Sequence, residues 1–160
     1  MKALSEAECP NEDVRSVFLF CCFTDRAQCD VRELTSGQIR DGWVNYQRRK
    51  TQQTTSIAIP PKVLADLALL GDADALVFPD LPGPRHVGSV LTKWAQRAGV
   101  IQNVTFHVAR HTFATMPITH GVDIYNVSKL MGHASVHVTQ VYAKVIDRKK
   151  YEAMQDLPEL

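Results

Sequence analysis

Two histidines, an arginine and a tyrosine in the second half of the chain have the types and spacing needed for chemistry on a phosphate. His107 and Arg110 lie three positions apart, so in a helix they share a face and can reach one anion. His133 follows Gly132, a typical helix stop, and Tyr142 comes nine residues after His133. Phosphoryl transfer needs such a set, because a nucleophile must attack a phosphorus whose charged oxygens are surrounded by donors.

The individual side chains suit different parts of this reaction. The guanidinium of Arg110 can donate two parallel hydrogen bonds to phosphate, which a lysine cannot reproduce. A tyrosine phenol has an unperturbed pKa near 10, so a tyrosine is a poor nucleophile unless a base takes its proton or cations lower that pKa. Taken alone, His107 and Arg110 also fit a surface pair on an amphipathic helix. Tyr142 taken alone also fits an ordinary helix residue.

Together these motifs resemble the tyrosine recombinase (phage integrase) family. Catalytic domains of that family carry an HxxRH motif, then a GH motif, then a nucleophilic tyrosine nine or ten residues further on. The chain has His107–His111, Gly132–His133 and Tyr142 in that order, and Thr139–Val145 is similar to the family's tyrosine segment. The resemblance covers roughly Phe18–Met154.

The front half of the chain contributes a further motif to this resemblance. The stretch Trp43–Pro60 looks like the family's hairpin, and Arg48, Lys50 and Thr51 match its RxKT pattern. By this resemblance Lys50 corresponds to the general acid. Further candidates for contacts with DNA are Arg49, Thr51, His111 and Arg26.

The resemblance implies a site-specific recombinase, or integrase, that cleaves and rejoins double-stranded DNA. Tyr142 would attack a phosphodiester to give a 3′-phosphotyrosyl intermediate, with His107 as base and Arg110 and His133 as phosphate donors. Lys50 would protonate the departing 5′-hydroxyl. Such an intermediate conserves bond energy, so no ATP, cofactor or metal is expected, and the sequence offers no carboxylate cluster for two-metal catalysis.

One catalytic arginine of the family is missing. Most members carry it in a TGLR segment, and anchoring the chain on Thr24, Asp30 and Leu34 places Ala27 at that position. The proposed site therefore lacks one cation.

Three explanations for the missing arginine are open. We expect Arg48, on the same side of its strand as Lys50, to supply the charge. Some recombinases of Bacteroidetes mobile elements, which the chain resembles in its FATxxxxxGV and YAKV segments, likewise lack this arginine and use a hairpin arginine. The second is Arg26, which a helical geometry would turn about 100° away from the site. The third is a DNA-binding protein that cleaves poorly.

Two other function classes compete with the recombinase. A type IB topoisomerase shares the tyrosine chemistry, but the RxKT, HxxRH, GH and YAKV set fits a recombinase better. A catalytically impaired regulator that binds DNA would use Tyr142 only as a helix residue. A covalent protein–DNA adduct distinguishes this regulator from an enzyme.

Composition indicates one globular domain. The 160 residues are 45% hydrophobic and 22% charged, and the apolar run Val17–Phe23 is far too short to span a membrane. We therefore expect a cytoplasmic protein, with its four cysteines reduced and structural. The formal net charge of +1 excludes coating of DNA by bulk charge, so binding must rely on local basic clusters.

The elements that position these residues are predicted to form a mainly helical fold with a small antiparallel sheet. Capping signals and hydrophobic periodicity indicate a first segment, Leu4–Phe23, with Ser5 as N-cap and the run Val14–Phe23 as a buried helix. Further helices are predicted at Ala27–Leu34, Lys62–Leu70, Gly88–Ala98, Thr105–His120, Ile124–Met131 and Val136–Val145. Strands are predicted at Gly42–Arg48, Thr54–Ile59 and Leu76–Phe78, with a turn at Lys50–Gln53 and helix stops at Gly71, Gly121 and Gly132.

Residues 1–160 are expected to form a single catalytic domain, without the N-terminal core-binding domain of full-length recombinases. The Lys50 hairpin and the Tyr142 helix should converge on the helix that carries His107 and Arg110. By the same resemblance, the full-length protein would assemble as a homotetramer on DNA attachment sites, where DNA-bending accessory proteins are possible partners. Protomers of the family often exchange a C-terminal segment, which here would follow about Arg148.

Overall fold

The computed structural model describes residues 2–47, 54–67, 71–133 and 135–143. The chain divides into two compact units, residues 1–110 (unit 1) and 111–160 (unit 2). The boundary falls between Arg110 and His111, inside helix α6 (Phe106–Thr119). No helix in the described parts of the chain has the length and apolar character needed to cross a membrane.

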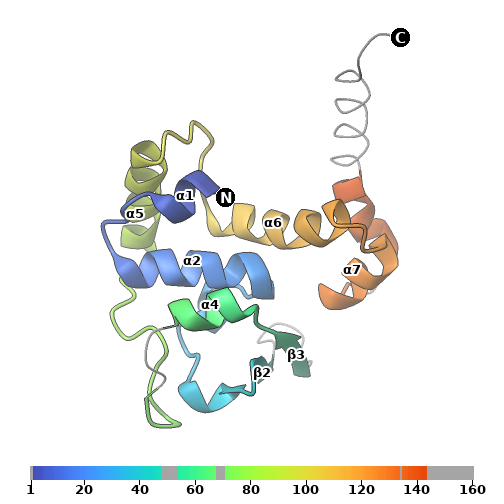
Figure 1. Ribbon diagram of the computed structural model, residues 1–160, viewed down its shortest axis with the longest axis horizontal. Helices are drawn as coiled ribbons and strands as arrows, with labels where there is room; N and C mark the ends of the chain where they lie inside the picture. The colour runs from blue at the N-terminus through green and yellow to red at the C-terminus, as the bar shows by residue number, and fades with distance from the viewer. Residues whose placement is uncertain (1, 48–53, 68–70, 134, 144–160) are drawn as a thin grey trace. The chain divides into compact units, whose positions relative to one another are not determined.

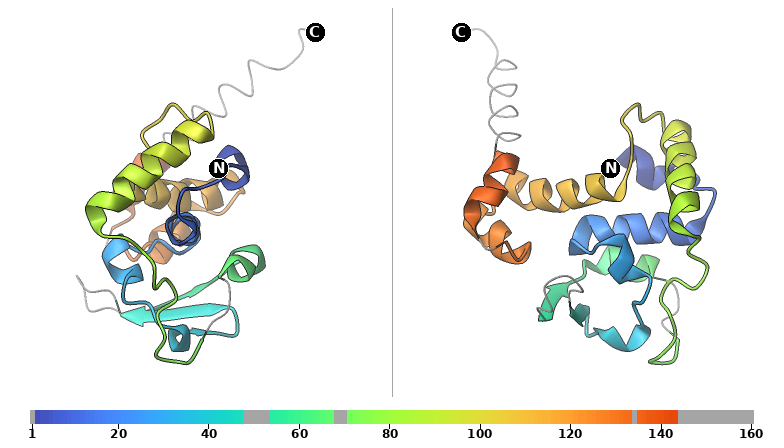
Figure 2. Two further views of the ribbon diagram at one scale, coloured as in Figure 1. Left: turned by 90° about the vertical axis from the view of Figure 1, so that its left-hand side faces the viewer. Right: turned by 180° about the vertical axis from the view of Figure 1, so that it is seen from behind.

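Unit 1 combines short helices with one small sheet (Figures 1 and 2). Its helices before α6 are α1 (Lys2–Glu6), α2 (Glu12–Thr24), α3 (Gln28–Val31), the 3-10 helix η1 (Ser36–Gln38), α4 (Pro61–Asp66) and α5 (Pro84–Arg97). Its sheet has the order β1 (Ile39–Arg40), β2 (Trp43–Gln47) and β3 (Thr54–Ala58), all antiparallel. The predicted fold class, mainly helical with a small antiparallel sheet, is confirmed.

Helix α2 is the centre of the unit 1 core, and its start corrects the sequence prediction. The chain leaves helical structure after α1, and α2 begins at Glu12, where the Asn11 side chain accepts a hydrogen bond from the Val14 amide at 2.8 Å. Ser5 lies inside α1 and is not the N-cap. The break has a physical reason, because Pro10 cannot donate a helical hydrogen bond and Asn11 is a strong N-cap.

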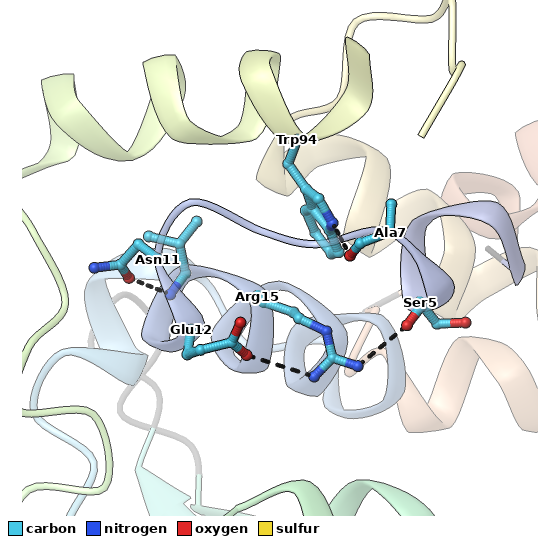
Figure 3. Close-up of polar contacts among 7 residues, drawn as sticks. Ser5, Ala7, Asn11, Glu12, Arg15 and Trp94 are labelled. Carbon is cyan, nitrogen blue, oxygen red and sulfur yellow. Dashed lines mark hydrogen bonds and ion pairs between the residues drawn. The ribbon is translucent and has the colours of Figure 1, made fainter. Parts of the chain in front are cut away.

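Buried side chains of α2 face α5. The ring of Phe18 packs edge-on against Trp94, with centroids 5.7 Å apart, and both side chains are fully buried. Figure 3 shows that the Trp94 indole Nε1 also donates to the Ala7 carbonyl at 3.0 Å, while Arg15 donates to the Ser5 carbonyl at 3.2 Å. These bonds attach α1 to α2 and the residue that follows α1 to α5.

Three of the four cysteines belong to this core. Cys9, Cys21 and Cys22 are buried thiols, whereas Cys29 is exposed. Burial raises the pKa of the Cys21 thiol well above its usual range, because a thiolate there would lose its hydration. Cys21 is therefore an unreactive packing residue.

The sheet matches the predicted strand pair and adds a strand. β2 and β3 pair from Trp43↔Ala58 to Gln47↔Thr54, and the buried side chains of Val44 and Tyr46 alternate with exposed neighbours in β2. The two-residue strand β1 was not predicted, because it is too short to show alternation. The predicted turn at Lys50–Gln53 lies outside the described residues.

Further boundaries differ from the prediction, and α3 ends at Val31 rather than at Leu34. Helix α4 ends at Asp66, so Gly71 does not cap it, and the predicted strand at Leu76–Phe78 is a single bridge between Thr35 and Leu76. Helix α5 begins at Pro84 rather than at Gly88, because proline is well suited to the first turn of a helix.

Unit 2 is built from the second part of α6, helix α7 (Ile124–Leu130) and the helical residues 136–143. Asp123 caps α7 by accepting hydrogen bonds from the amides of Tyr125 and Asn126. The stops predicted at Gly121 and Gly132 are confirmed, since these glycines have φ values of 87° and 65°. The small core consists of Phe113, Ala114, Val127, Met131 and Tyr142.

Candidate active site

His107 and Arg110 lie on α6, one helical turn apart, as predicted. His107 is exposed and Arg110 is half-buried. The Arg110 guanidinium forms an ion pair with Asp25, with Nη1 and Oδ1 2.8 Å apart. The carboxylate of Asp25 is fully buried, while about a third of the Arg110 side chain is exposed (34%). Arg110 is therefore anchored on one side by a carboxylate from another element.

Sequence reasoning missed Asp25. The motifs assign it no role, and the structure shows that it caps α2, since its amide donates to the Cys21 carbonyl at 3.2 Å. Its backbone adopts the left-handed conformation, with φ 53° and ψ 23°. A usable signal was present, because an acidic residue directly after a buried helix needs a cationic partner when it folds into the same core.

Arg26 does not lie on a helix, which corrects the geometry assumed from the sequence. Residues 25–27 are non-helical, and α3 begins at Gln28. The Arg26 side chain is buried, with Cζ 3.7 Å from the centroid of the Tyr46 ring on β2. A guanidinium over a ring face is stabilised by cation–π attraction. Arg26 would have to leave Tyr46 to contact a phosphate, whereas Ala27 is exposed.

Tyr142 lies on the helical residues 136–143 and is almost fully buried, with 6% of its surface exposed. Its ring packs edge-on against His111, with centroids 5.2 Å apart. Both residues belong to unit 2, so this contact places the HxxRH motif's last histidine beside the tyrosine. The tyrosine ring thus serves as a packing element of the unit 2 core.

His133 is held by the same helical segment. Its Nδ1 lies 2.8 Å from the hydroxyl Oγ1 of Thr139, which is fully buried, and its amide donates to the Ser128 carbonyl at 3.0 Å. This contact at Nδ1 fixes the orientation of the imidazole, with Nε2 on the opposite edge of the ring. Sequence reasoning noted Thr139 only as part of the tyrosine segment.

The four hairpin candidates, Arg48, Arg49, Lys50 and Thr51, lie outside the described residues. Strands β2 and β3 end at the pair Gln47↔Thr54, directly before and after this segment. In the described parts of the chain, no group of three or more His, Cys, Asp or Glu side chains has the arrangement of a metal site.

The sequence profile of the phage integrase family matches residues 33–149. The chain belongs to the phage integrase family. It is 38% identical over 76 residues to tyrosine recombinase XerA of Pyrococcus horikoshii, a match that covers 48% of this chain and 26% of that protein. It is 31% identical over 121 residues to a tyrosine recombinase of Thermosipho africanus, covering 72% of this chain and 43% of that protein. The chain spans less than half the length of these curated relatives.

Solved structures of this class share the fold. A crystal structure of XerA recombinase aligns with a TM-score of 0.76 at 22% identity, covering 99% of this chain and 62% of that chain. The catalytic domain of bacteriophage HP1 integrase aligns with a TM-score of 0.68 at 19% identity, covering 98% and 93%. A lambda integrase dimer bound to a COC′ core site aligns with a TM-score of 0.68 at 18% identity, covering 88% and 55%.

Proposed function

We propose that the chain is the catalytic domain of a site-specific recombinase that cleaves and rejoins double-stranded DNA. The observation that carries this proposal is the family match to residues 33–149, because that range includes all six proposed catalytic residues. They are Arg48, Lys50, His107, Arg110, His133 and Tyr142. The lambda integrase neighbour, whose structure contains a DNA core site, supports double-stranded DNA as the partner.

The proposed reaction is a transesterification in which every bond broken is replaced. The Tyr142 oxygen attacks the phosphorus, its proton passes to His107, and a 3′-phosphotyrosyl bond forms. The bond to the 5′-oxygen breaks, and Lys50 gives that oxygen a proton. Arg110 and His133 donate hydrogen bonds to the non-bridging oxygens, where negative charge builds up. Reversal with another 5′-hydroxyl completes strand exchange.

The wider setting is proposed on the same basis. The full-length protein would act in the cytoplasm as a homotetramer on two attachment sites, with DNA-bending proteins as possible helpers. The FATxxxxxGV segment from Phe113 to Val122 and the YAKV segment from Tyr142 to Val145 further suggest an integrase of a Bacteroidetes mobile element.

The decisive experiment looks for the covalent intermediate. The chain is incubated with a pool of nicked duplexes of randomised sequence, and adducts that survive denaturant are counted. We expect an adduct with the wild-type chain and with Tyr125→Phe, a control at an exposed tyrosine, and none with Tyr142→Phe. Tyr142→Phe should fold normally, since it keeps the ring that packs against His111. A wild-type chain without any adduct would indicate a non-catalytic DNA-binding regulator.

The same assay identifies the replacement for the missing arginine. We propose that Arg48 supplies this charge, so Arg48→Ala should lose adduct formation. Arg26→Ala should lower the melting temperature, because the Tyr46 ring loses its buried partner, but the folded fraction should still form the adduct. Loss of the adduct in folded Arg26→Ala alone would contradict the assignment to Arg48.

A further inference from the structure

A buried carboxylate anchors Arg110. The side chain of Asp25 has no exposed surface, and its Oδ1 lies 2.8 Å from Nη1 of Arg110. An ionised carboxylate away from water is strongly unfavourable unless a cation and hydrogen bonds compensate it. The pair is therefore a fixed structural link between the end of α2 and the middle of α6.

The backbone under Asp25 is also fixed. Asp25 follows the last residue of α2 with a left-handed φ of 53°, and its amide donates to the Cys21 carbonyl. The hydroxyl of the preceding Thr24 donates to the Phe20 carbonyl at 2.8 Å, and Thr24 is fully buried. Left-handed backbone is disfavoured for a residue with a side chain, although aspartate tolerates it better than most. The backbone that carries the carboxylate is thus held in place by these hydrogen bonds.

We propose that Asp25 is a positioning residue that holds Arg110 in the orientation needed for phosphate. This inference rests on the DNA cleavage proposed above. The guanidinium is planar and rigid, so fixing one amino group fixes the plane of the whole group. Transition-state stabilisation depends on such placement, since an error of about 1 Å can cost roughly 100-fold in rate. Asp25 acts through Arg110 rather than on the DNA.

The charge of Asp25 makes this role separable from a purely structural one. Asp25 offsets the positive charge of Arg110, so Asp25→Asn removes a negative charge beside the phosphate donor. DNA binding should then be as tight as in the wild type or tighter. Cleavage should nevertheless be slower, because the guanidinium plane is no longer fixed. A residue that only maintained the fold would weaken binding and cleavage together.

A matched control is available at Asp41. Asp41 also has a left-handed backbone, with φ 51°, but it is exposed, and Asp41→Asn changes the charge by the same amount. On the pool of nicked duplexes, we expect adduct formation at saturating DNA to fall by roughly 10- to 100-fold in Asp25→Asn and to stay at the wild-type rate in Asp41→Asn. The dissociation constant for DNA should not rise in either variant.

A double variant tests whether Asp25 acts through Arg110. Adduct formation in Asp25→Asn/Arg110→Lys should be no slower than in Arg110→Lys alone, because the positioned group is already gone. If the two losses multiply instead, Asp25 acts on something else and the inference fails. It also fails if folded Asp25→Asn cleaves as fast as the wild type. Should Asp25→Asn fold poorly, Asp25→Gly removes the carboxylate while suiting the left-handed backbone.

A readout without DNA separates this inference from the proposed function. In NMR of arginine side chains, an anchored guanidinium rotates slowly and therefore gives resolved Nη signals. One such set, present in the wild type, should disappear in both Asp25→Asn and Arg110→Lys. Persistence of the Arg110 signals in Asp25→Asn would overturn the anchoring. A wild-type chain that forms no adduct refutes the recombinase function itself, whereas a wild-type adduct with an unaffected Asp25→Asn refutes only the positioning role.

Discussion

His133 shows how one buried hydroxyl can prepare a residue for catalysis. The Thr139 hydroxyl engages Nδ1 at 2.8 Å, from the same helical segment that carries Tyr142 three residues later. The imidazole is therefore oriented before any phosphate arrives, and in the proposed chemistry Nε2 is the atom that donates to the phosphate.

Removing this hydroxyl tests that arrangement. Thr139→Val keeps the shape of a fully buried side chain but loses the hydrogen bond, so we expect covalent adduct formation to slow by roughly tenfold, as for a lost hydrogen bond of about 1.4 kcal/mol. Thr139→Ser keeps the hydroxyl and should stay close to the wild-type rate. Equal rates for Thr139→Val and the wild type would show that His133 is oriented by other contacts.

At the scale of elements, the start of α2 depends on a single side chain. The Asn11 side chain accepts a hydrogen bond from the Val14 amide at 2.8 Å. Glu12 and Asp13 place negative charge in the first turn, where the helix dipole favours it. Because α2 carries the core side chains Phe18 and Phe20, its first turn affects the whole of unit 1.

We expect Asn11→Ala to lower the free energy of unfolding by about 1 kcal/mol. Asn11→Asp, which still offers a capping oxygen, should change it much less. Urea unfolding followed by circular dichroism measures both. An equal loss in the two variants would mean that the cap contributes nothing measurable and that packing alone sets the start of α2.

The elements also show what local sequence could and could not reveal. Helix α7 and the β2–β3 pair were predicted nearly in full, because the glycine stops at Gly121 and Gly132 and the strand alternation are local signals. The start of α2 was missed because the acidic residues after Ser5 imitate a helix start. The link between Asp25 and Arg110 joins distant parts of the chain, so it follows from packing and no spacing rule predicts it.

Within the proposed site, the sequence motifs identified the reacting groups but not their supports. His107 and Arg110 share a helix as predicted, and Tyr142 lies on a helical segment as predicted. Their anchors, Asp25 and Thr139, carry no motif in the sequence that assigns them a role, since a buried carboxylate and a buried hydroxyl look like ordinary polar residues. Supporting groups of this kind are brought to the site only by the tertiary structure, so sequence patterns do not identify them.

At the scale of the whole molecule, the described residues of the two units form hydrophobic clusters of very different size. The core of unit 1 is extensive and includes the fully buried Trp94 and Phe18. Among the described residues of unit 2 the core is small, and Tyr142 itself is one of its members. A small core supplies little stabilisation, because hydrophobic stabilisation scales with the apolar area removed from water. Unit 2 should therefore open at a lower free energy than unit 1.

Paired truncations in the two cores test this difference. Met131→Ala, at a fully buried position of unit 2, should cost about 2–5 kcal/mol locally, and Leu91→Ala in α5 is its counterpart in unit 1. In hydrogen exchange with mass spectrometry, Met131→Ala should speed exchange in α7 and residues 136–143 while α2 keeps its wild-type protection. Leu91→Ala should instead speed exchange in α2 and α5.

Uniform acceleration across both units in either variant would contradict this expectation and would mean that the chain unfolds as one cooperative body. The predicted outcome has a consequence for the proposed chemistry. Since Tyr142 packs among the same residues as Met131, a local opening of unit 2 would release the proposed nucleophile from its packing. A marginal unit 2 core makes this opening accessible at a low free energy while the larger core of unit 1 stays folded.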